Sequence, residues 1–210
     1  MSASAEWELE QLRLFFNIAK DDASGVLGVI DYEHHAIHDG DSFVCHYSNT
    51  VTNINEMTVI AFNTPDTTRW VHVVVEYTAT ALARALLIEA PSIDVDEGTA
   101  LLIFNRDRNS AKESGVLSIE TAPVANRATS YNEAQATGAN ITINAANTVS
   151  EHHIGGGSGP FGTGGGQLQR DEYILKQNTQ YAFILEALNN DDNIHNMHVS
   201  WYEHVNRVAA

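Results

Sequence analysis

Histidines that lie close together in the sequence are the residues best suited to chemistry, as ligands of a metal ion. They form two clusters, the first of which follows a carboxylate: Glu33, His34, His35 and His38, and then His152 and His153. Imidazole and carboxylate groups bind transition metals, so residues 33–35 lying beside Glu203 and His204 would gather a set of ligands. However, the metalloprotease pattern HExxH and the paired spacing of zinc fingers are missing from the sequence. We therefore expect these histidines to form local hydrogen bonds on the polar faces of strands, with no metal and no other cofactor.

Cys45 and His46 are adjacent, which suggests a thiol–imidazole pair for nucleophilic catalysis. Adjacent side chains of a strand point to opposite faces, however, so these two groups could not share a hydrogen bond there. We expect Cys45 to be a buried structural residue. It is the single cysteine of the chain, so an intrachain disulfide is impossible, and we expect assembly in a reducing compartment.

Two further segments resemble ion-binding loops, but each lacks a required part. Asp94, Asp96 and Gly98 match the start of a calcium loop, yet the later acidic ligand of an EF-hand is missing. The glycine-rich residues 155–166 lack the Gly-Lys-Ser/Thr ending of a phosphate-binding loop and resemble a surface linker. The nucleophile pattern GxSxG is also missing. We therefore expect no catalytic residue and no enzymatic activity.

The composition predicts one acidic domain. With 27 acidic and 11 basic residues the formal net charge is -16, which would repel nucleic acid and anionic membranes. Such a charge suits solubility or docking onto a basic protein surface. The 210 residues are enough for one all-β domain. The chain begins without a basic and apolar signal sequence, and no apolar run reaches the roughly 20 residues of a membrane span, so we expect a soluble protein made in the cytoplasm.

Most of the chain divides into short segments typical of strands. Residues 70–77 are the clearest case, because valines and a tyrosine alternate with more polar side chains. Residues 79–90 have the propensity of a helix, but 84–89 fit a strand equally well. The other expected strands are 29–37, 43–47, 57–62, 101–104, 116–121, 141–143, 170–176, 180–186 and 198–204. We expect 170–176 and 180–186 to form a hairpin, and 198–204 to complete a three-stranded meander.

The predicted architecture is an all-β, antiparallel β-sandwich of the jelly-roll type over residues 31–210, preceded by an N-terminal arm, residues 1–30. In the arm, the stripe of an amphipathic helix would consist of Leu9, Leu12, Phe15, Phe16 and Ala19. Leu12, Leu14 and Phe16 fit one face of a strand equally well. Residues 21–25 fit a turn. The arm either packs on its own domain or reaches a neighbouring subunit.

Five segments, in the same order, resemble a family of virion structural proteins of tailed bacteriophages. They are residues 31–43 (DYEHHAIHDGDSF), 64–72 (TPDTTRWVH), 105–110 (NRDRNS), 170–179 (RDEYILKQNT) and 201–204 (WYEH). The resemblance implies a non-enzymatic decoration or cement protein on the outer surface of the capsid, or a related head–neck accessory protein. Its partners would be the major capsid protein and further copies of itself, which we expect to form a homotrimer.

Two other functions are open on the sequence alone. A tail or head fibre module that binds a receptor or a glycan would use exposed Trp and Tyr side chains as a stacking surface. A metal-dependent enzyme of the cupin type would use the histidines. The capsid role predicts that the protein lies on the virion and binds neither nucleic acid nor membrane.

Overall fold

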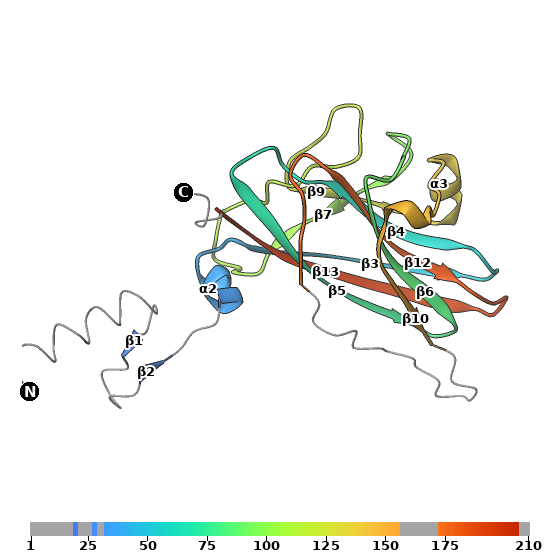
Figure 1. The fold of residues 1–210 in the computed structure, drawn as a ribbon, viewed down its shortest axis with the longest axis horizontal. Coiled ribbons are helices and arrows are strands. Elements are labelled where there is room, and N and C mark those ends of the chain that lie inside the picture. The colour runs from blue at the N-terminus through green and yellow to red at the C-terminus, as the bar shows by residue number, and fades with distance from the viewer. Residues whose placement is uncertain (1–18, 21–26, 29–31, 156–171, 206–210) are drawn as a thin grey trace, which may run out of the picture.

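The computed structural model describes residues 19–20, 27–28, 32–155 and 172–205, and it consists mainly of two antiparallel sheets packed face to face (Figure 1). We call the five-stranded one the front sheet; its strands, in spatial order, are β11 (Tyr173–Ile174), β5 (Arg69–Ala79), β13 (Asn193–Val205), β3 (Ser42–Val51) and β8 (Phe104–Asn105). The six-stranded back sheet contains β10 (Thr148–Ile154), β6 (Ala83–Glu89), β12 (Gln180–Ala187), β4 (Met57–Asn63), β9 (Arg127–Tyr131) and β7 (Thr99–Leu102). The prediction of an all-β sandwich is confirmed.

The order of the strands is that of a jelly roll. Four neighbours of the front sheet run β3, β13, β5, β11, and four of the back sheet run β4, β12, β6, β10. The chain passes from the front to the back sheet between β3 and β4 and between β5 and β6, and it changes sheet again from β10 to β11 and from β12 to β13. This arrangement of eight strands pairs strands that are distant in the sequence. The strands β7, β8 and β9 belong to an insertion between β6 and β10.

The core between the sheets is apolar and rich in aromatic rings. Trp201 of β13 is 2% exposed, and its ring lies 5.6 Å from that of Phe62 and 6.1 Å from that of Phe43. Phe183 of β12 packs against Phe62 at 5.4 Å between ring centroids. Cys45 is also buried in this core, and its neighbour His46 is exposed, so the two side chains do point to opposite faces. Aromatic side chains from both sheets therefore meet in one interior.

The two sheets differ in their outer faces. The outer face of the back sheet is covered by a second apolar layer, to which helix α3 (Glu133–Gly138) and the loops before and after it contribute. Consequently β4 and β12 are buried along nearly their whole length. In β3 and β13 buried and more exposed residues alternate instead, because one face of the front sheet is uncovered by the described residues. We call this outer face of the front sheet the open face.

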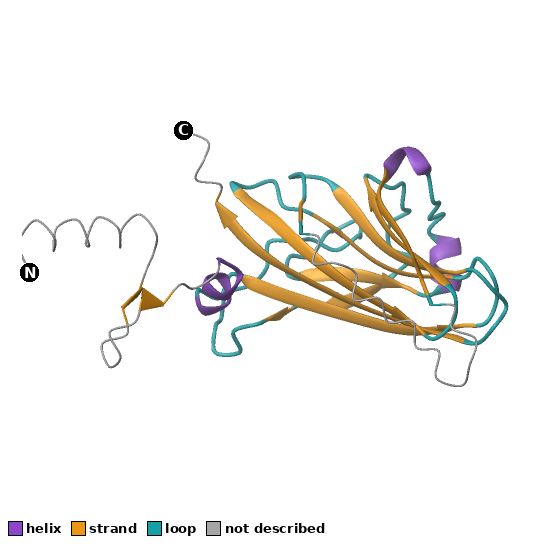
Figure 2. Cartoon of the chain, turned by 60° about the horizontal axis from the view of Figure 1, so that its bottom comes forward, coloured by secondary structure: helices purple, strands orange, loops and turns teal. Residues whose placement is uncertain are grey.

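Helix α2 (Tyr32–His38) lies at one end of the sandwich, and α3 lies at the other (Figure 2). The short helix α2 adjoins the start of β3 and the end of β13. The prediction of a strand at 29–37 is therefore wrong for the described residues 32–37. A short run of mixed apolar and polar residues fits a strand or a helical turn, and here buried Ala36 and half-buried Ile37 pack as the inner side of a helical turn.

Four further predictions are wrong. Residues 141–143 form a loop rather than a strand, because buried Ile141 packs in the apolar layer over the back sheet. The expected hairpin does not form either: a turn is present at Gln177 and Asn178, but β11 belongs to the front sheet and β12 to the back sheet. For the same reason β13 does not complete a meander with them. Residues 116–121 form only isolated bridges through Leu117.

Elements between β8 and β11 were missed or only partly predicted. The strands β9 and β10, helix α3 and the 3-10 helix η1 (Ala145–Asn147) lie within residues 127–154, where the only expected element was the strand 141–143. Of the helix and the strand considered for residues 79–90, the structure contains the strand, since 84–89 lie in β6. Most of the expected arm and most of the glycine-rich segment 155–166 lie outside the described residues. Within the arm, β1 (Ala19–Lys20) and β2 (Leu27–Gly28) pair antiparallel. The turn expected at 21–25 lies outside the described residues.

Candidate functional site

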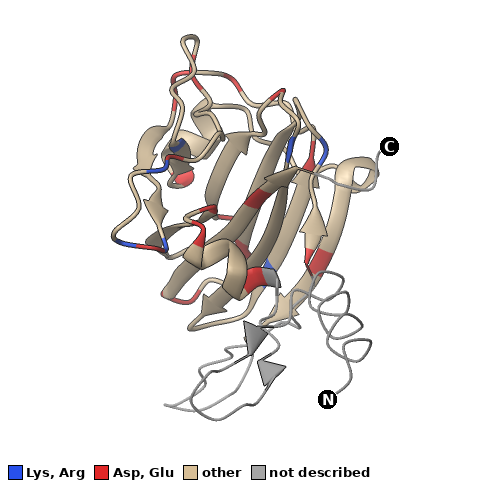
Figure 3. Cartoon of the chain, turned by 90° about the vertical axis from the view of Figure 1, so that its left-hand side faces the viewer, with Lys and Arg blue, Asp and Glu red and all other residues tan. Residues whose placement is uncertain are grey.

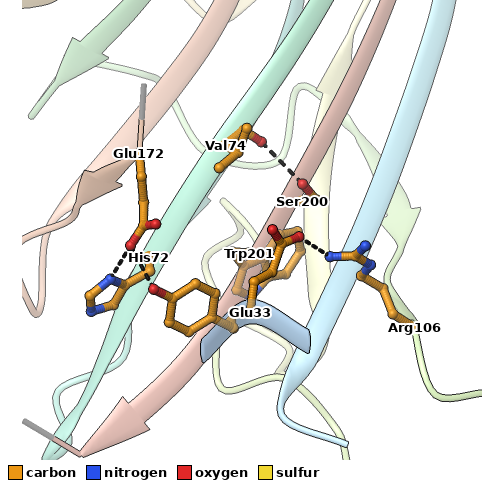
Figure 4. Close-up of a pocket in the computed structure, with 8 residues that line it drawn as sticks. Glu33, His72, Val74, Arg106, Glu172, Ser200 and Trp201 are labelled. Atoms are coloured by element: carbon orange, nitrogen blue, oxygen red, sulfur yellow. Dashed lines mark hydrogen bonds and ion pairs between the residues drawn. The ribbon is translucent and has the colours of Figure 1, made fainter. Parts of the chain in front are cut away.

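A shallow polar cleft lies on the open face, at the α2 end of the front sheet (Figure 4). Its lining comes from α2, from β5 and β13, from Arg106 just after β8, and from the residue before β11. These residues are Glu33, His72, Val74, Arg106, Glu172, Ser200, Trp201 and Tyr202. The enclosed space holds about one water molecule, far less than the several hundred Å³ of a typical small-molecule pocket. The cleft is therefore suited to side-chain recognition at a surface rather than to enclosing a substrate.

On one side of the cleft, a carboxylate accepts two short hydrogen bonds. Nδ1 of His72 lies 2.6 Å from Oε1 of Glu172, and the hydroxyl of Tyr202 donates to the same oxygen at 2.6 Å. The strand register places His72 and Tyr202 opposite each other on β5 and β13. Their rings stack with centroids 4.7 Å apart, and the ring of His204 lies 4.3 Å from that of His72. The group therefore joins β5 and β13 to Glu172, the residue before β11.

The protonation of this group follows from its surroundings. Burial lowers the pKa of His72, and the Glu172 carboxylate only partly opposes this effect. Burial alone would raise the pKa of Glu172, but hydrogen bonds from Tyr202 and His72 outweigh burial and hold the pKa below its usual value. At neutral pH the imidazole of His72 is therefore neutral and donates from Nδ1 to the ionised carboxylate of Glu172. The hydroxyl of Ser200, which points outward from β13, donates to the carbonyl of Val74 at 3.4 Å.

On the other side of the cleft, an ion pair joins α2 to the segment after β8. Arg106 Nη1 lies 2.6 Å from Glu33 Oε1 and also donates to Ser42 Oγ at 3.4 Å. The backbone N–H of Arg106 donates to the carbonyl of Ser42 at 2.8 Å. Figure 4 shows Glu172 and Arg106 on opposite sides of the cleft. The cleft therefore presents the Glu172 carboxylate on one side and the Arg106–Glu33 ion pair on the other.

The ligand set that we considered from the sequence does not assemble around one point. Glu33 pairs with Arg106, and Glu203 is buried in the opposite direction, where it accepts from Ser114 Oγ at 2.6 Å and from Trp201 Nε1 at 3.2 Å. His204 lies on the open face instead. Within the described ranges, no group of three or more His, Cys, Asp or Glu residues is arranged to hold a metal ion.

The remaining histidine pair and the acidic turn take local partners. His152 lies 2.8 Å from Ser150 Oγ, and its neighbour His153 pairs with Glu151 at 3.5 Å, so the two imidazoles have separate surroundings. In the turn, Asp94 accepts a hydrogen bond from Asn140, and Asp96 accepts two from Thr121. These carboxylates stabilise the loops that cover the back sheet.

Sequence reasoning missed the contact between His72 and Glu172. The residues lie 100 positions apart, and His72 was assigned only to the more polar face of its strand. Three signals were present: a histidine and a tyrosine facing outward on strands with an alternating pattern, and a carboxylate at the start of the segment 172–176. Nothing local to either residue indicates that β5 and β11 are neighbours.

The chain was compared with protein-family models, curated proteins and solved structures, and no match was found. Among the described residues, no helix is both long enough and apolar enough to cross a membrane.

Proposed function

We propose that this chain is a non-enzymatic structural protein of a bacteriophage virion, which binds the outside of the capsid and stabilises the junctions between shell subunits. The proposal starts from the five ordered segments that resemble a family of virion proteins. It is supported by the jelly-roll order of the strands, a topology common among viral capsid proteins. The same topology also occurs in lectins and cupins, so the argument must rest on surfaces rather than on the fold.

The open face is the observation that favours a docking function. The back sheet is covered on its outer side, whereas β3, β5 and β13 present a continuous row of outward side chains. These include Thr50, Ser48 and His46 on β3, Thr78 and Glu76 on β5, and Asn196 and His198 on β13. Over ten residues, three strands span about 14 Å by 33 Å, or about 460 Å². This is more than half of the roughly 800 Å² that a standard interface buries on each partner.

The charge of the chain favours a basic partner surface. Acidic residues are spread over the strands and loops (Figure 3), and the sequence contains 27 of them against 11 basic residues. On the open face, Glu76 has 71% of its side chain exposed and lies 3.7 Å from His198, an imidazole that carries a charge only when it is protonated. Opposite charge on a shell subunit would speed association and fix its orientation. The cleft beside Glu172 and Arg106 would then receive a polar side chain of that subunit.

The fibre alternative receives less support from the aromatic residues. It requires exposed rings on which a sugar can stack, but Trp201 is buried in the core, and Tyr202 is 7% exposed and stacked against His72. Trp70, on the outer side of β5, is only partly exposed. In the cupin alternative several histidines would converge inside the sandwich, whereas His72 and His204 lie on its outer side. His195 does face inward, but it lies beside Thr58, and no group of three or more potential metal ligands forms around it among the described residues. We therefore favour the capsid role.

The first test is the copy number of the chain in virions produced from the genome that encodes it. We expect quantitative mass spectrometry to find a simple fraction of the number of major shell proteins. A handful of copies per particle would favour a neck or tail position instead, and absence from the particle would overturn the proposal. In solution, we expect light scattering to give the mass of a trimer, about 69 kDa from three chains of 23.0 kDa.

The second test locates the interface with two variants of equal charge change. Ser48→Arg places a long side chain on the open face. Ala134→Arg places the same side chain at an exposed position of α3, on the other side of the molecule. Binding to heads that lack the protein should weaken by about tenfold or more for Ser48→Arg, because a buried, unpaired charge is costly at an interface. Ala134→Arg should bind as the unchanged protein does. Equal binding by both variants would exclude the open face as the contact surface.

A further inference from the structure

Helix α2 is short, but its end is well defined. The N–H of Gly40 donates to the carbonyl of Ile37 at 3.0 Å, and that of Asp41 donates to the carbonyl of Ala36 at 2.9 Å. These two bonds form a Schellman motif, which requires the left-handed conformation that Gly40 adopts at φ 71°. A side chain at Gly40 would collide with Ser110, so this turn tolerates only glycine without rearrangement.

Two further contacts hold the helix against the sandwich. Ala36 is buried on its inner side, and Glu33 pairs with Arg106 at 2.6 Å. The outer side of α2 is therefore presented in a fixed orientation, with its exposed side chains directed away from the core.

That outer side brings two imidazoles together. His34 and His38 are four residues apart, which places them on the same face of a helix. Their Nε2 atoms lie 3.0 Å apart, and their ring centroids are separated by 4.7 Å at an angle of 64° between the ring planes. Both residues are exposed. The third histidine, His35, points elsewhere and pairs with Asp39 at 2.9 Å.

We infer that His34 and His38 form a bidentate site for a divalent transition-metal ion, with Cu(II) the preferred occupant. Imidazole nitrogens bind such ions at about 2.0–2.1 Å. An ion at that distance from two nitrogens 3.0 Å apart would bind them at an angle of about 91–97°. This angle matches adjacent positions of a square-planar or tetragonal ion, as Cu(II) and Ni(II) prefer, better than the tetrahedral angle of zinc. Among these ions, Cu(II) binds nitrogen ligands most tightly.

The proton balance of binding is simple. In the described structure one Nε2 donates to the other, and which of them donates depends on the tautomer. When a metal takes both Nε2 lone pairs, each neutral imidazole keeps its remaining proton on Nδ1. One ring therefore changes its tautomer and no proton is released, whereas in acid solution protons compete with the ion.

The surroundings of the site favour a cation. The chain carries a formal net charge of -16, which raises the local concentration of cations. Two protein ligands leave other coordination positions to water or to a side chain of a bound partner. Because α2 adjoins the end of the open face, such a ligand could come from a protein docked there. The inference itself does not rest on the proposed capsid function.

The test uses the full chain without a histidine tag. Isothermal titration with CuCl₂ should give one site, and the electron paramagnetic resonance spectrum should show coupling to two imidazole nitrogens. The dissociation constant should rise about tenfold or more in His34→Ala and in His38→Ala, because each loses half of the protein ligands. His35→Ala is the matched control on the same helix, and its affinity should stay within about twofold of the unchanged protein.

Other surface histidines provide the result that would overturn the inference. His46 and His198 lie opposite each other on β3 and β13, so they form a second exposed pair. Loss of the copper site in His46→Ala with retention in His38→Ala would place it there and refute the assignment to α2. Equal affinity in all variants would indicate adventitious binding only. Circular dichroism of each variant establishes that it is folded, and melting temperatures with and without Cu(II) give a second readout, since an intact site raises the melting temperature.

Discussion

A buried histidine gives a quantitative prediction of how stability depends on pH. His195 lies on the inward side of β13 and is 0% exposed. Its Nδ1 lies 3.1 Å from Thr58 Oγ1, and its Nε2 has no hydrogen-bond partner among the described residues. Burial lowers the pKa of His195 to about 4, against the weaker opposing effect of the Glu56 carboxylate. The imidazole is therefore neutral in the folded protein at pH 7.

The sign and size of the effect follow from this pKa. In the unfolded chain the pKa of a histidine is 6.5, so below that pH the unfolded state binds more protons than the folded state. The stabilising contribution is complete above pH 6.5 and is lost as the pH falls toward 4. At pH 5 the proton-binding polynomial of His195 is about 30 times larger in the unfolded state than in the folded state. This factor lowers the free energy of unfolding by about 2 kcal/mol.

The assay is urea denaturation at pH 8 and pH 5 of the unchanged protein and of two variants. His195→Asn removes the titrating group and keeps a polar side chain for Thr58. Between pH 8 and pH 5 its free energy of unfolding should therefore fall by about 2 kcal/mol less than that of the unchanged protein. His198→Asn is the matched control three residues along β13, with half of its side chain exposed. Contributions of other groups, including His72, are the same in each protein and cancel. An equal pH dependence in all three proteins, or a titration of His195 near pH 6.5 by NMR, would refute the reasoning.

Two further predictions concern buried polar groups. Glu203 accepts hydrogen bonds from Ser114 Oγ, the Gly115 N–H and Trp201 Nε1. In Glu203→Gln an amide donor replaces one acceptor, so the free energy of unfolding measured in urea should fall by about 1–3 kcal/mol. An unchanged value would contradict this account. Burial raises the pKa of Cys45 to about 12. Alkylation of this thiol by iodoacetamide at pH 8 should therefore require opening of the fold, and its rate should increase with urea. Rapid labelling without denaturant would contradict the burial.

The pattern of hydrophobic residues predicted the class of fold because it reports burial directly. Residues 57–62 and 180–186 are almost continuously apolar, and their strands prove to be buried on both faces. Residues 70–77 and 198–204 alternate more, and their strands belong to the front sheet with its open face. The difference between the sheets is thus present in the sequence. Continuous and alternating runs both predict strands, so the assignment of strands alone does not separate the two sheets.

Pairing of the strands could not be predicted in the same way. The apolar runs around Asn178 have the local form of a hairpin, and Asn178 does adopt a positive φ of 47° in a turn. Whether that turn joins paired strands depends on partners far away in the sequence: β11 pairs with β5, and β12 lies between β4 and β6. In a jelly roll the pairing is largely non-local, so turn chemistry alone does not identify the neighbours.

The candidate metal site illustrates how one local error changes a functional interpretation. In a strand, four residues extend over about 13 Å, so His34 and His38 would share a face but could not share one ion. In a helix the same spacing is a single turn, and the two Nε2 atoms lie 3.0 Å apart. The sequence contained the i,i+4 spacing, but not the packing of Ala36 and the Gly40 turn that make this segment helical. The chemistry available to these imidazoles is therefore decided by the fold of seven residues.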